Sequence, residues 1–205
     1  PLIITNFYKK EKIVKVFNQE KYQIPDGIGI IIASKMKDGN IIKRIAGVDF
    51  FEKLCKLSIK EKQTIFLYGG KEEVVKKAKE NLEKKYKNIS IVKTINGYVK
   101  EQEALKEILK AKPSMLFIAI GSPKQEKFII NNKNKLKNIK IIMPIGGTLD
   151  VISGNIKRAP KIIVKLNLEW LYRTCNEPKR IKSNIKILYF IFLVIFKNNC
   201  YNNKS

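Results

Sequence analysis

Apolar residues follow two alternating patterns between residues 63 and 154. Short continuous apolar runs, which are typical of strands buried on both faces, occur at 63–70, 89–98, 114–126 and 140–154. Charged stretches with apolar residues at helical spacing lie at 71–88, 100–112 and about 124–137. Strands that alternate with helices predict a parallel sheet with helices on both faces, a Rossmann-like α/β fold.

Three of the predicted strands run into glycine-bearing loops, with the sequences YGGKEE, GSPKQE and PIGGTLD. Ligands of such sheets bind beyond the carboxyl ends of the strands, and glycine lets the backbone approach a ligand closely. None of the loops matches a dinucleotide-binding motif or a P-loop, so any single one could simply turn the chain. The three together favour a nucleotide-type site.

The strand pattern stops after residue 155, and the sequence then predicts two helices, the second beginning near Pro178. This last helix contains ten uninterrupted apolar residues, 187–196, which are too few for a membrane span of about 20 residues. Four basic residues precede them: Lys179, Arg180, Lys182 and Lys186. A basic segment joined to an apolar one predicts shallow insertion at an anionic membrane surface. A core helix or a subunit interface is the alternative.

The length of 205 residues allows one sizeable domain and an appendage. We therefore expect a Rossmann-like catalytic domain over 1–155 and a helical appendage over 156–205. The formal net charge of +24 favours polyanionic partners, although much of the lysine accompanies isoleucine and asparagine and suits solvated faces. Arginine is the more selective signal, because three of the four arginines follow residue 157.

Three absences restrict the chemistry. The three cysteines lack CxxC spacing, which argues against a disulfide framework or a zinc site and fits a reducing cytosol. The sequence contains no histidine, which excludes Ser-His and Cys-His nucleophilic triads and histidine-ligated metals. It also contains no DxD pair of the kind that holds a divalent metal beside a nucleotide sugar, so cationic side chains would have to stabilise a leaving diphosphate.

Three side chains are candidates for chemistry. Asp26 stands between Pro25 and Gly27 before an apolar segment, where it could take a proton from a sugar or alcohol hydroxyl; an Asx turn or a helix cap is the alternative. Arg44 could bind phosphate through two N–H groups, or be an ordinary surface charge. Gln125 can donate and accept hydrogen bonds, as recognition of a sugar or base requires, or lie on a helix surface.

Seven stretches appear in an order that resembles one family. They are PDGIGIIIASK, RIAGVDFFEKL, FLYGGKEEVVKKA, NGY, AIGSPKQE, PIGGTLDVISGNIKRAPK and LEWLYRTCNEPKR, within about residues 22–183. Together they resemble the WecG/TagA/CpsF family, glycosyltransferase family 26. The resemblance implies an inverting enzyme without metal or cofactor. It would move N-acetylmannosamine from a UDP donor to undecaprenyl-diphosphate-linked GlcNAc in synthesis of a cell-surface polysaccharide or teichoic acid.

The alternatives are another UDP-sugar, such as glucose or N-acetylmannosaminuronic acid, and a non-catalytic basic module that binds nucleotide or RNA. The sequence lacks the interleaved basic and aromatic residues of RNA-binding motifs, so we expect no nucleic-acid partner. The resemblance further implies a peripheral location on the cytoplasmic face of the cell membrane, where the lipid-linked acceptor lies. A homo-oligomer that buries the apolar tail is the alternative to contact with lipid.

The resemblance also implies roles for individual residues. Asp26 matches the proposed catalytic base, Arg44 and Gln125 match positions implicated in activity, and Arg173 and Arg180 match appendage arginines that meet the donor diphosphate. Ser183 departs from the pattern, because a further arginine is expected there. The remaining expected substrate-binding residues are Thr5, Asn6, Gly69, Gly70, Tyr98, Gly121, Pro123, Gly146 and Gly147.

Overall fold

The computed structural model describes residues 2–7, 11–20, 22–39, 43–165, 169, 171–172, 185, 189–190 and 192–194. The chain divides into two compact units. The first, Gly47–Arg158, is called the sheet unit here, and the second, Pro1–Ala46 with Ala159–Ser205, the terminal unit. The predicted division into domains 1–155 and 156–205 states which parts of the chain fold independently, and it stays a prediction.

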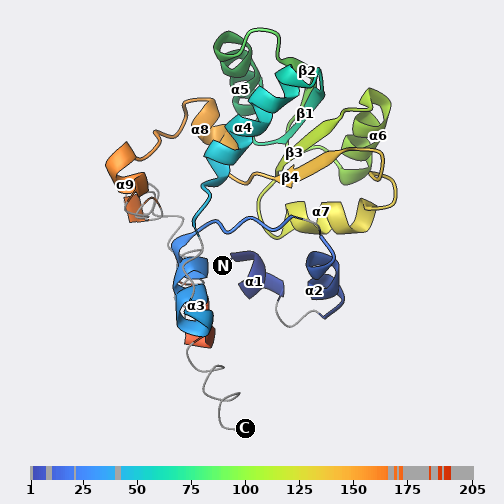
Figure 1. Ribbon diagram of the computed structural model, residues 1–205. Helices are drawn as coiled ribbons and strands as arrows, with labels where there is room; N and C mark the ends of the chain where they lie inside the picture. The colour runs from blue at the N-terminus through green and yellow to red at the C-terminus, as the bar shows by residue number, and fades with distance from the viewer. Residues whose placement is uncertain are drawn as a thin grey trace. The chain divides into compact units, whose positions relative to one another are not determined.

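The sheet unit contains a four-stranded parallel sheet (Figure 1). Its strands are β1 (Thr64–Gly69), β2 (Ser90–Ile95), β3 (Met115–Ala119) and β4 (Ile141–Pro144). The strand order is β2-β1-β3-β4. From β1 the chain continues to β2 at one edge of the sheet, and from β3 it continues to β4 at the opposite edge. The carboxyl ends of β1 and β3 therefore form a topological switch point, which is where open α/β sheets bind ligands.

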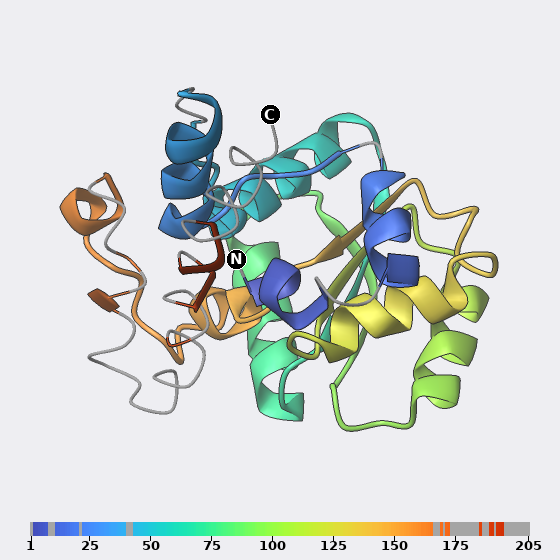
Figure 2. The same ribbon diagram turned by 90° about the horizontal axis from the view of Figure 1, so that it is seen from below.

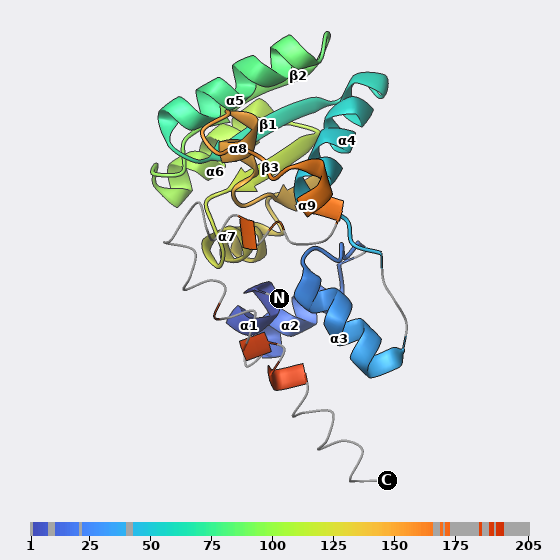
Figure 3. The same cartoon turned by 90° about the vertical axis from the view of Figure 1, so that its left-hand side faces the viewer.

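Helices cover both faces of this sheet (Figures 1 and 2). The helices of the unit are α4 (Gly47–Lys60), α5 (Glu72–Lys85), α6 (Glu101–Ala111), α7 (Lys124–Asn132) and α8 (Thr148–Ile152). Helices α4, α5 and α8 pack on one face, where α5 and α8 lie side by side (Figure 3), and α6 and α7 pack on the other. The predicted α/β class, with a parallel sheet and flanking helices, is confirmed.

The two cores follow from the alternation of side chains along the central strands. Ile65 and Leu67 of β1 point into the core beneath α4 and α5, whereas Phe66 and Tyr68 point into the core beneath α6 and α7. All four are buried, which is why β1 is a continuous apolar run in the sequence. On the α7 face, the Tyr68 ring lies 5.3 Å from the ring of Phe128.

One predicted element is too long. The helix expected over about 124–137 ends at Asn132, and the chain continues in turns. The Asn132 side chain takes part in this ending, because its Nδ2 donates to the carbonyl of Phe128 at 2.9 Å and to Glu101 Oε1 at 3.0 Å. Leu136 is nevertheless fully buried, which explains the apolar spacing that suggested a longer helix.

The terminal unit contains α1 (Leu2–Phe7), α2 (Glu11–Asn18), α3 (Ile28–Asp38) and α9 (Lys161–Lys165). The rings of Phe7 and Phe17, from α1 and α2, lie 5.8 Å apart. In the described part of the chain, no helix is both long enough and apolar enough to span a bilayer. Of the predicted apolar tail, only 189–190 and 192–194 are described, and the four basic residues before it lie outside the described residues.

Candidate functional site

The ends of β1 and β3 approach each other so closely that only glycine fits at Gly69. A Cβ atom built there would lie 2.4 Å from the carbonyl carbon and oxygen of Ala119, and the φ angle is +133°. The next residue continues the contact, since the N–H of Gly70 donates to the carbonyl of Ala119 at 3.1 Å. Gly69 and Gly70, which the sequence predicts as substrate-binding residues, therefore shape the backbone at the switch point.

The loop after β2 is hydrogen-bonded to the loop after β1, at the same edge of the sheet. The N–H of Gly97 donates to the carbonyl of Gly70 at 2.8 Å, and the side chain of Asn96 accepts the N–H of Tyr98 at 2.9 Å. Asn96 Nδ2 also donates to Glu72 Oε2 at 2.7 Å. This hydrogen bond is the largest cause, and the bond from Lys76 the next largest, of a pKa of Glu72 below its ordinary value. Tyr98 is 79% exposed, so this loop presents an aromatic residue to solvent.

The loop after β4 begins helix α8. Gly146 has a φ of +50° with open space where a Cβ would be, and Gly147 is the N-cap residue of α8. Thr148 then donates its hydroxyl to the carbonyl of Ile145 at 2.7 Å. Both glycines follow the carboxyl end of β4, as the sequence predicts. Their role in binding stays a prediction.

Gln125 lies in the first turn of α7, directly after the β3 loop that contains Gly121 and Pro123. The alternative that Gln125 lies on a helix surface is wrong, because the residue is only 6% exposed. Its Nε2 donates to Glu126 Oε1 at 2.9 Å, and Glu126 is itself 1% exposed. Pro123, which follows a cis peptide bond, is the N-cap residue of this helix.

A second cluster of predicted residues lies in the terminal unit. Arg44 Nε donates to Asp26 Oδ1 at 3.4 Å, and Arg44 Nη2 donates to Glu169 Oε2 at 3.0 Å. The Arg44 side chain is 13% exposed, so the alternative of an ordinary surface charge is wrong. The side chain of Asp26 is 50% exposed, and the N-cap position of α3 belongs to Gly27 rather than to Asp26.

The remaining predicted residues are placed as follows. Thr5 and Asn6 lie half-buried on α1. Arg173, Arg180 and the departure at Ser183 lie outside the described residues. The structure thus brings Asp26 to Arg44 within the terminal unit, and it brings the loops after β1 and β2 together within the sheet unit.

Sequence reasoning missed two carboxylates, Glu126 and Glu169. A signal for Glu126 was available, because it follows Gln125 in the same GSPKQE motif. Glu169 carries a weaker signal: it is one of only two glutamates after residue 150, within a segment rich in basic residues. Its partner Arg44 is 125 positions away, so no local pattern reveals the pair.

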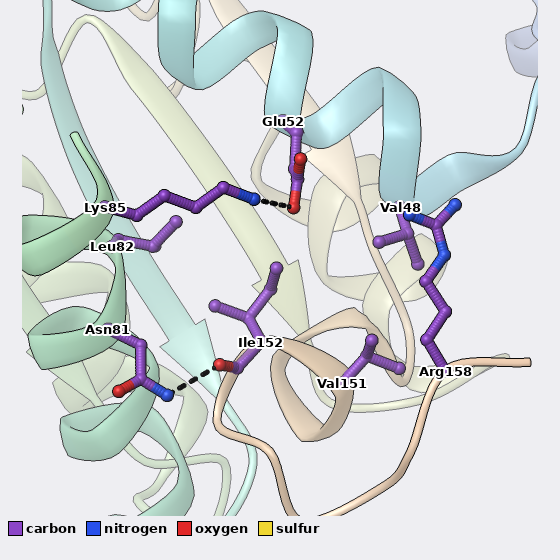
Figure 4. A pocket seen from close by; sticks show the side chains of 8 residues that line it. All are labelled: Val48, Glu52, Asn81, Leu82, Lys85, Val151, Ile152 and Arg158. Carbon is purple, nitrogen blue, oxygen red and sulfur yellow. Dashed lines mark hydrogen bonds and ion pairs between the residues drawn. The ribbon is translucent and has the colours of Figure 1, made fainter.

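A pocket of about 330 Å³ lies on the helical face formed by α4, α5 and α8 (Figure 4). Each of its charged side chains has an ionic partner: Lys85 Nζ lies 2.7 Å from Glu52 Oε1, and Arg158 Nη2 lies 2.5 Å from Asp49 Oδ1, although Arg158 Nε is buried without a hydrogen-bond partner among the residues that the structure describes. The bond to Glu52 raises the pKa of Lys85. None of the predicted site residues that the structure describes lines this pocket, so we place the candidate site at the strand ends and not here.

Burial raises the pKa of the Cys55 thiol from 9.0 to about 12, so this cysteine stays protonated and is a poor nucleophile. Within the described ranges, no three cysteine or acidic side chains gather where they could hold a metal ion.

Known proteins are similar to this chain over most of its length. A model of the glycosyl transferase WecG/TagA/CpsF family matches residues 1–204. A protein of Bacillus subtilis (strain 168) is 38% identical over 181 residues, which cover 88% of this chain and 70% of the relative. A protein of Staphylococcus aureus (strain MW2) is 33% identical over 196 residues, which cover 95% and 76%. Both are named N-acetylglucosaminyldiphosphoundecaprenol N-acetyl-beta-D-mannosaminyltransferase. The chain therefore belongs to the glycosyl transferase WecG/TagA/CpsF family.

Proposed function

We propose that this glycosyltransferase transfers N-acetylmannosamine from a UDP donor to GlcNAc linked to undecaprenyl diphosphate. The names of relatives that are 33–38% identical support the sugar and the acceptor. The observation that carries the chemistry is the Asp26–Arg44 pair, in which a half-exposed carboxylate is held by a nearly buried guanidinium. Because the Asp26 side chain is half-exposed, a substrate hydroxyl can reach it, as a general base requires.

In this proposal Asp26 takes the proton from an acceptor hydroxyl. The acceptor oxygen attacks the anomeric carbon of the donor as the bond from that carbon to the phosphate oxygen breaks, so the configuration inverts and UDP leaves. Arg173 and Arg180 are proposed to neutralise the leaving diphosphate, in place of a metal ion. The strand-end loops with Gly69, Gly70 and Tyr98 are proposed to bind the donor.

The same proposal extends to location. We propose that the segment 156–205 associates with the inner face of the cell membrane, where the polyprenyl chain of the acceptor is anchored. The ten apolar residues at 187–196 and the basic residues before them support this placement. In this arrangement the protein reaches the diphosphate and sugar of the acceptor while the lipid stays in the bilayer.

A UDP-release assay tests the proposed reaction. It offers a panel of UDP-sugars with a lipid-diphosphate-GlcNAc analogue, in the presence of EDTA. We expect turnover that persists in EDTA and is highest with UDP-N-acetylmannosamine. The variant Asp26→Asn should be slower by about a hundredfold, because it lacks the general base.

The matched control for this variant is Glu103→Gln, which also removes one negative charge and lies exposed on α6. It should retain the wild-type rate. Equal rates for Asp26→Asn and wild type would remove Asp26 from the role of base. Faster turnover with UDP-glucose or the uronic acid donor would correct the sugar but keep the reaction.

A further inference from the structure

Two hydrogen-bond acceptors at the start of α7 are buried without a partner. They are Gln125 Oε1 and Glu126 Oε2, and no donor among the described residues reaches either atom. The other polar atoms of the two side chains bond to each other, Nε2 of Gln125 to Oε1 of Glu126 at 2.9 Å. The pair therefore presents one amide oxygen and one carboxylate oxygen that the chain itself leaves unsatisfied.

The local sequence explains why Glu126 lacks its usual partner. A glutamate three positions after an N-cap residue normally accepts the backbone N–H of that residue. The N-cap residue of α7 is Pro123, which has no N–H to give. Burying a carboxylate with a single bond to a neutral amide is costly for the folded chain. Buried polar groups are normally hydrogen-bonded, so an acceptor that the chain itself leaves unsatisfied is a candidate for a bond from a ligand.

The position of the pair indicates the kind of ligand. Helix α7 follows the carboxyl end of β3, which lies at the topological switch point beside β1. A carboxylate repels a diphosphate, so these two oxygens suit neutral donors, namely hydroxyl or amide N–H groups. A UDP-sugar carries such groups on its sugar and on its uridine.

We infer that Glu126 is a donor-binding residue, and that Glu126 Oε2 and Gln125 Oε1 accept hydrogen bonds from hydroxyl or N–H groups of the UDP-sugar. The Gln125–Glu126 bond orients the amide so that its carbonyl oxygen, not its NH₂ group, is offered to the ligand. This inference rests on the proposed function, since it assumes a UDP-sugar donor.

The test is the variant Glu126→Gln, which keeps the shape of the side chain and removes its charge. Titration calorimetry measures the affinity for UDP and for UDP-N-acetylmannosamine, and thermal unfolding measures stability. We expect the affinity for the UDP-sugar to fall by about tenfold to a hundredfold, because a bond to a charged acceptor is lost. The melting temperature should stay the same or rise, because an unsatisfied buried charge is removed. If Glu126 had a purely structural role, the variant would keep its affinity for the UDP-sugar and would have a lower melting temperature.

The two ligands locate the contact. A loss seen with UDP alone assigns the donors to uridine, and a loss seen only with the complete UDP-sugar assigns them to the sugar; both support the inference. Glu103→Gln should bind like wild type. If Glu126→Gln fails to fold, Glu126→Asp keeps the charge, withdraws the oxygens by one methylene and should show the same loss of affinity.

Other outcomes overturn the inference. Unchanged affinity in the Glu126 variants, with a wild-type protein that binds and transfers the sugar, contradicts the inference and leaves the proposed function standing. Affinity that needs added Mg²⁺ and disappears in EDTA would assign the two oxygens to a cation instead. A wild-type protein that neither binds nor uses any UDP-sugar would contradict the proposed function itself.

Discussion

Arg44 is one of four arginines in the chain, and its guanidinium contacts two carboxylates of very different exposure. The contact with Glu169 is short, at 3.0 Å, and the Glu169 side chain is only 7% exposed. The contact with Asp26 is 3.4 Å, and that side chain is 50% exposed. Because the contact with Glu169 is the shorter and the more buried of the two, Glu169 should anchor Arg44, whereas the half-exposed Asp26 side chain is accessible to solvent.

This difference predicts unequal losses of stability. Glu169→Ala should lower the free energy of unfolding by about 3 kcal/mol, because it removes the shorter and more buried of the two described carboxylate contacts of Arg44. Asp26→Ala should cost no more than about 1 kcal/mol, since its pair is half-exposed and solvent screens it. Urea unfolding of the full chain measures both values.

A third variant serves as the control. Glu73→Ala removes a 68% exposed carboxylate that lies 3.8 Å from Lys71, and it should change stability by less than about 0.5 kcal/mol. Equal losses for Glu169→Ala and Asp26→Ala would mean that Arg44 is held by both carboxylates alike. The assignment of Glu169 as the anchor would then be wrong.

At the scale of elements, the loops after β1, β2 and β3 are joined by backbone contacts that need glycine. Gly69 lies against Ala119, and Gly97 lies against Ile120 and Gly70. A Cβ at Gly97 would be 3.1 Å from Ile120 Cγ2, which is tight but yields more readily than the backbone contact at Gly69. Tyr98 and the start of α7 therefore lie in loops that leave a closely packed switch point.

Gly69→Ala should therefore be severely destabilising. Both the positive φ and the backbone contact at 2.4 Å act against a side chain, and we expect a loss of about 3 kcal/mol or more in urea unfolding. Gly154→Ala is the matched control, because Gly154 has a φ of +84° but open space around it. It should cost only about 1 kcal/mol, the conformational part alone. Similar losses at both positions would show that close approach contributes little.

The sequence predicts these elements well for a physical reason. Strands buried on both faces, such as β1 and β3, consist of apolar residues throughout, so their runs can be read directly. The surface helices between them keep helical spacing, and α5 and α6 lie within the predicted ranges. The end of α7 could not be read, because Leu136 is buried beyond the helix and continues its apolar spacing.

The candidate site is predicted less completely than the fold. Asp26 and Arg44 could be proposed from the motifs around them, and they do meet. The burial of Gln125 could not be predicted, because a glutamine in a charged helical stretch ordinarily faces solvent. The structure nevertheless leaves it only 6% exposed. Glu169 was missed for a similar reason, since its contact joins segments far apart in the chain.

At the scale of the whole molecule, 42 basic residues outnumber 18 acidic ones. A charge of this size attracts any anionic surface, so binding to anionic vesicles would not by itself identify a docking segment. The proposal for the segment 156–205 is more specific. It requires that the basic residues next to the apolar run contribute more to binding than equal charges elsewhere on the chain.

Two triple variants with the same change in net charge separate these cases. One replaces Lys179, Lys182 and Lys186 with Gln, and the other replaces Lys106, Lys110 and Lys112, which lie exposed on and after α6. In flotation with vesicles that contain anionic lipid, the first variant should bind about a hundredfold more weakly than wild type, because each lysine near the surface contributes about 1 kcal/mol. The second should bind almost like wild type.

Equal losses in the two variants would indicate general charge attraction. No loss in either, together with a dimer or trimer by light scattering, would instead place the apolar run between subunits.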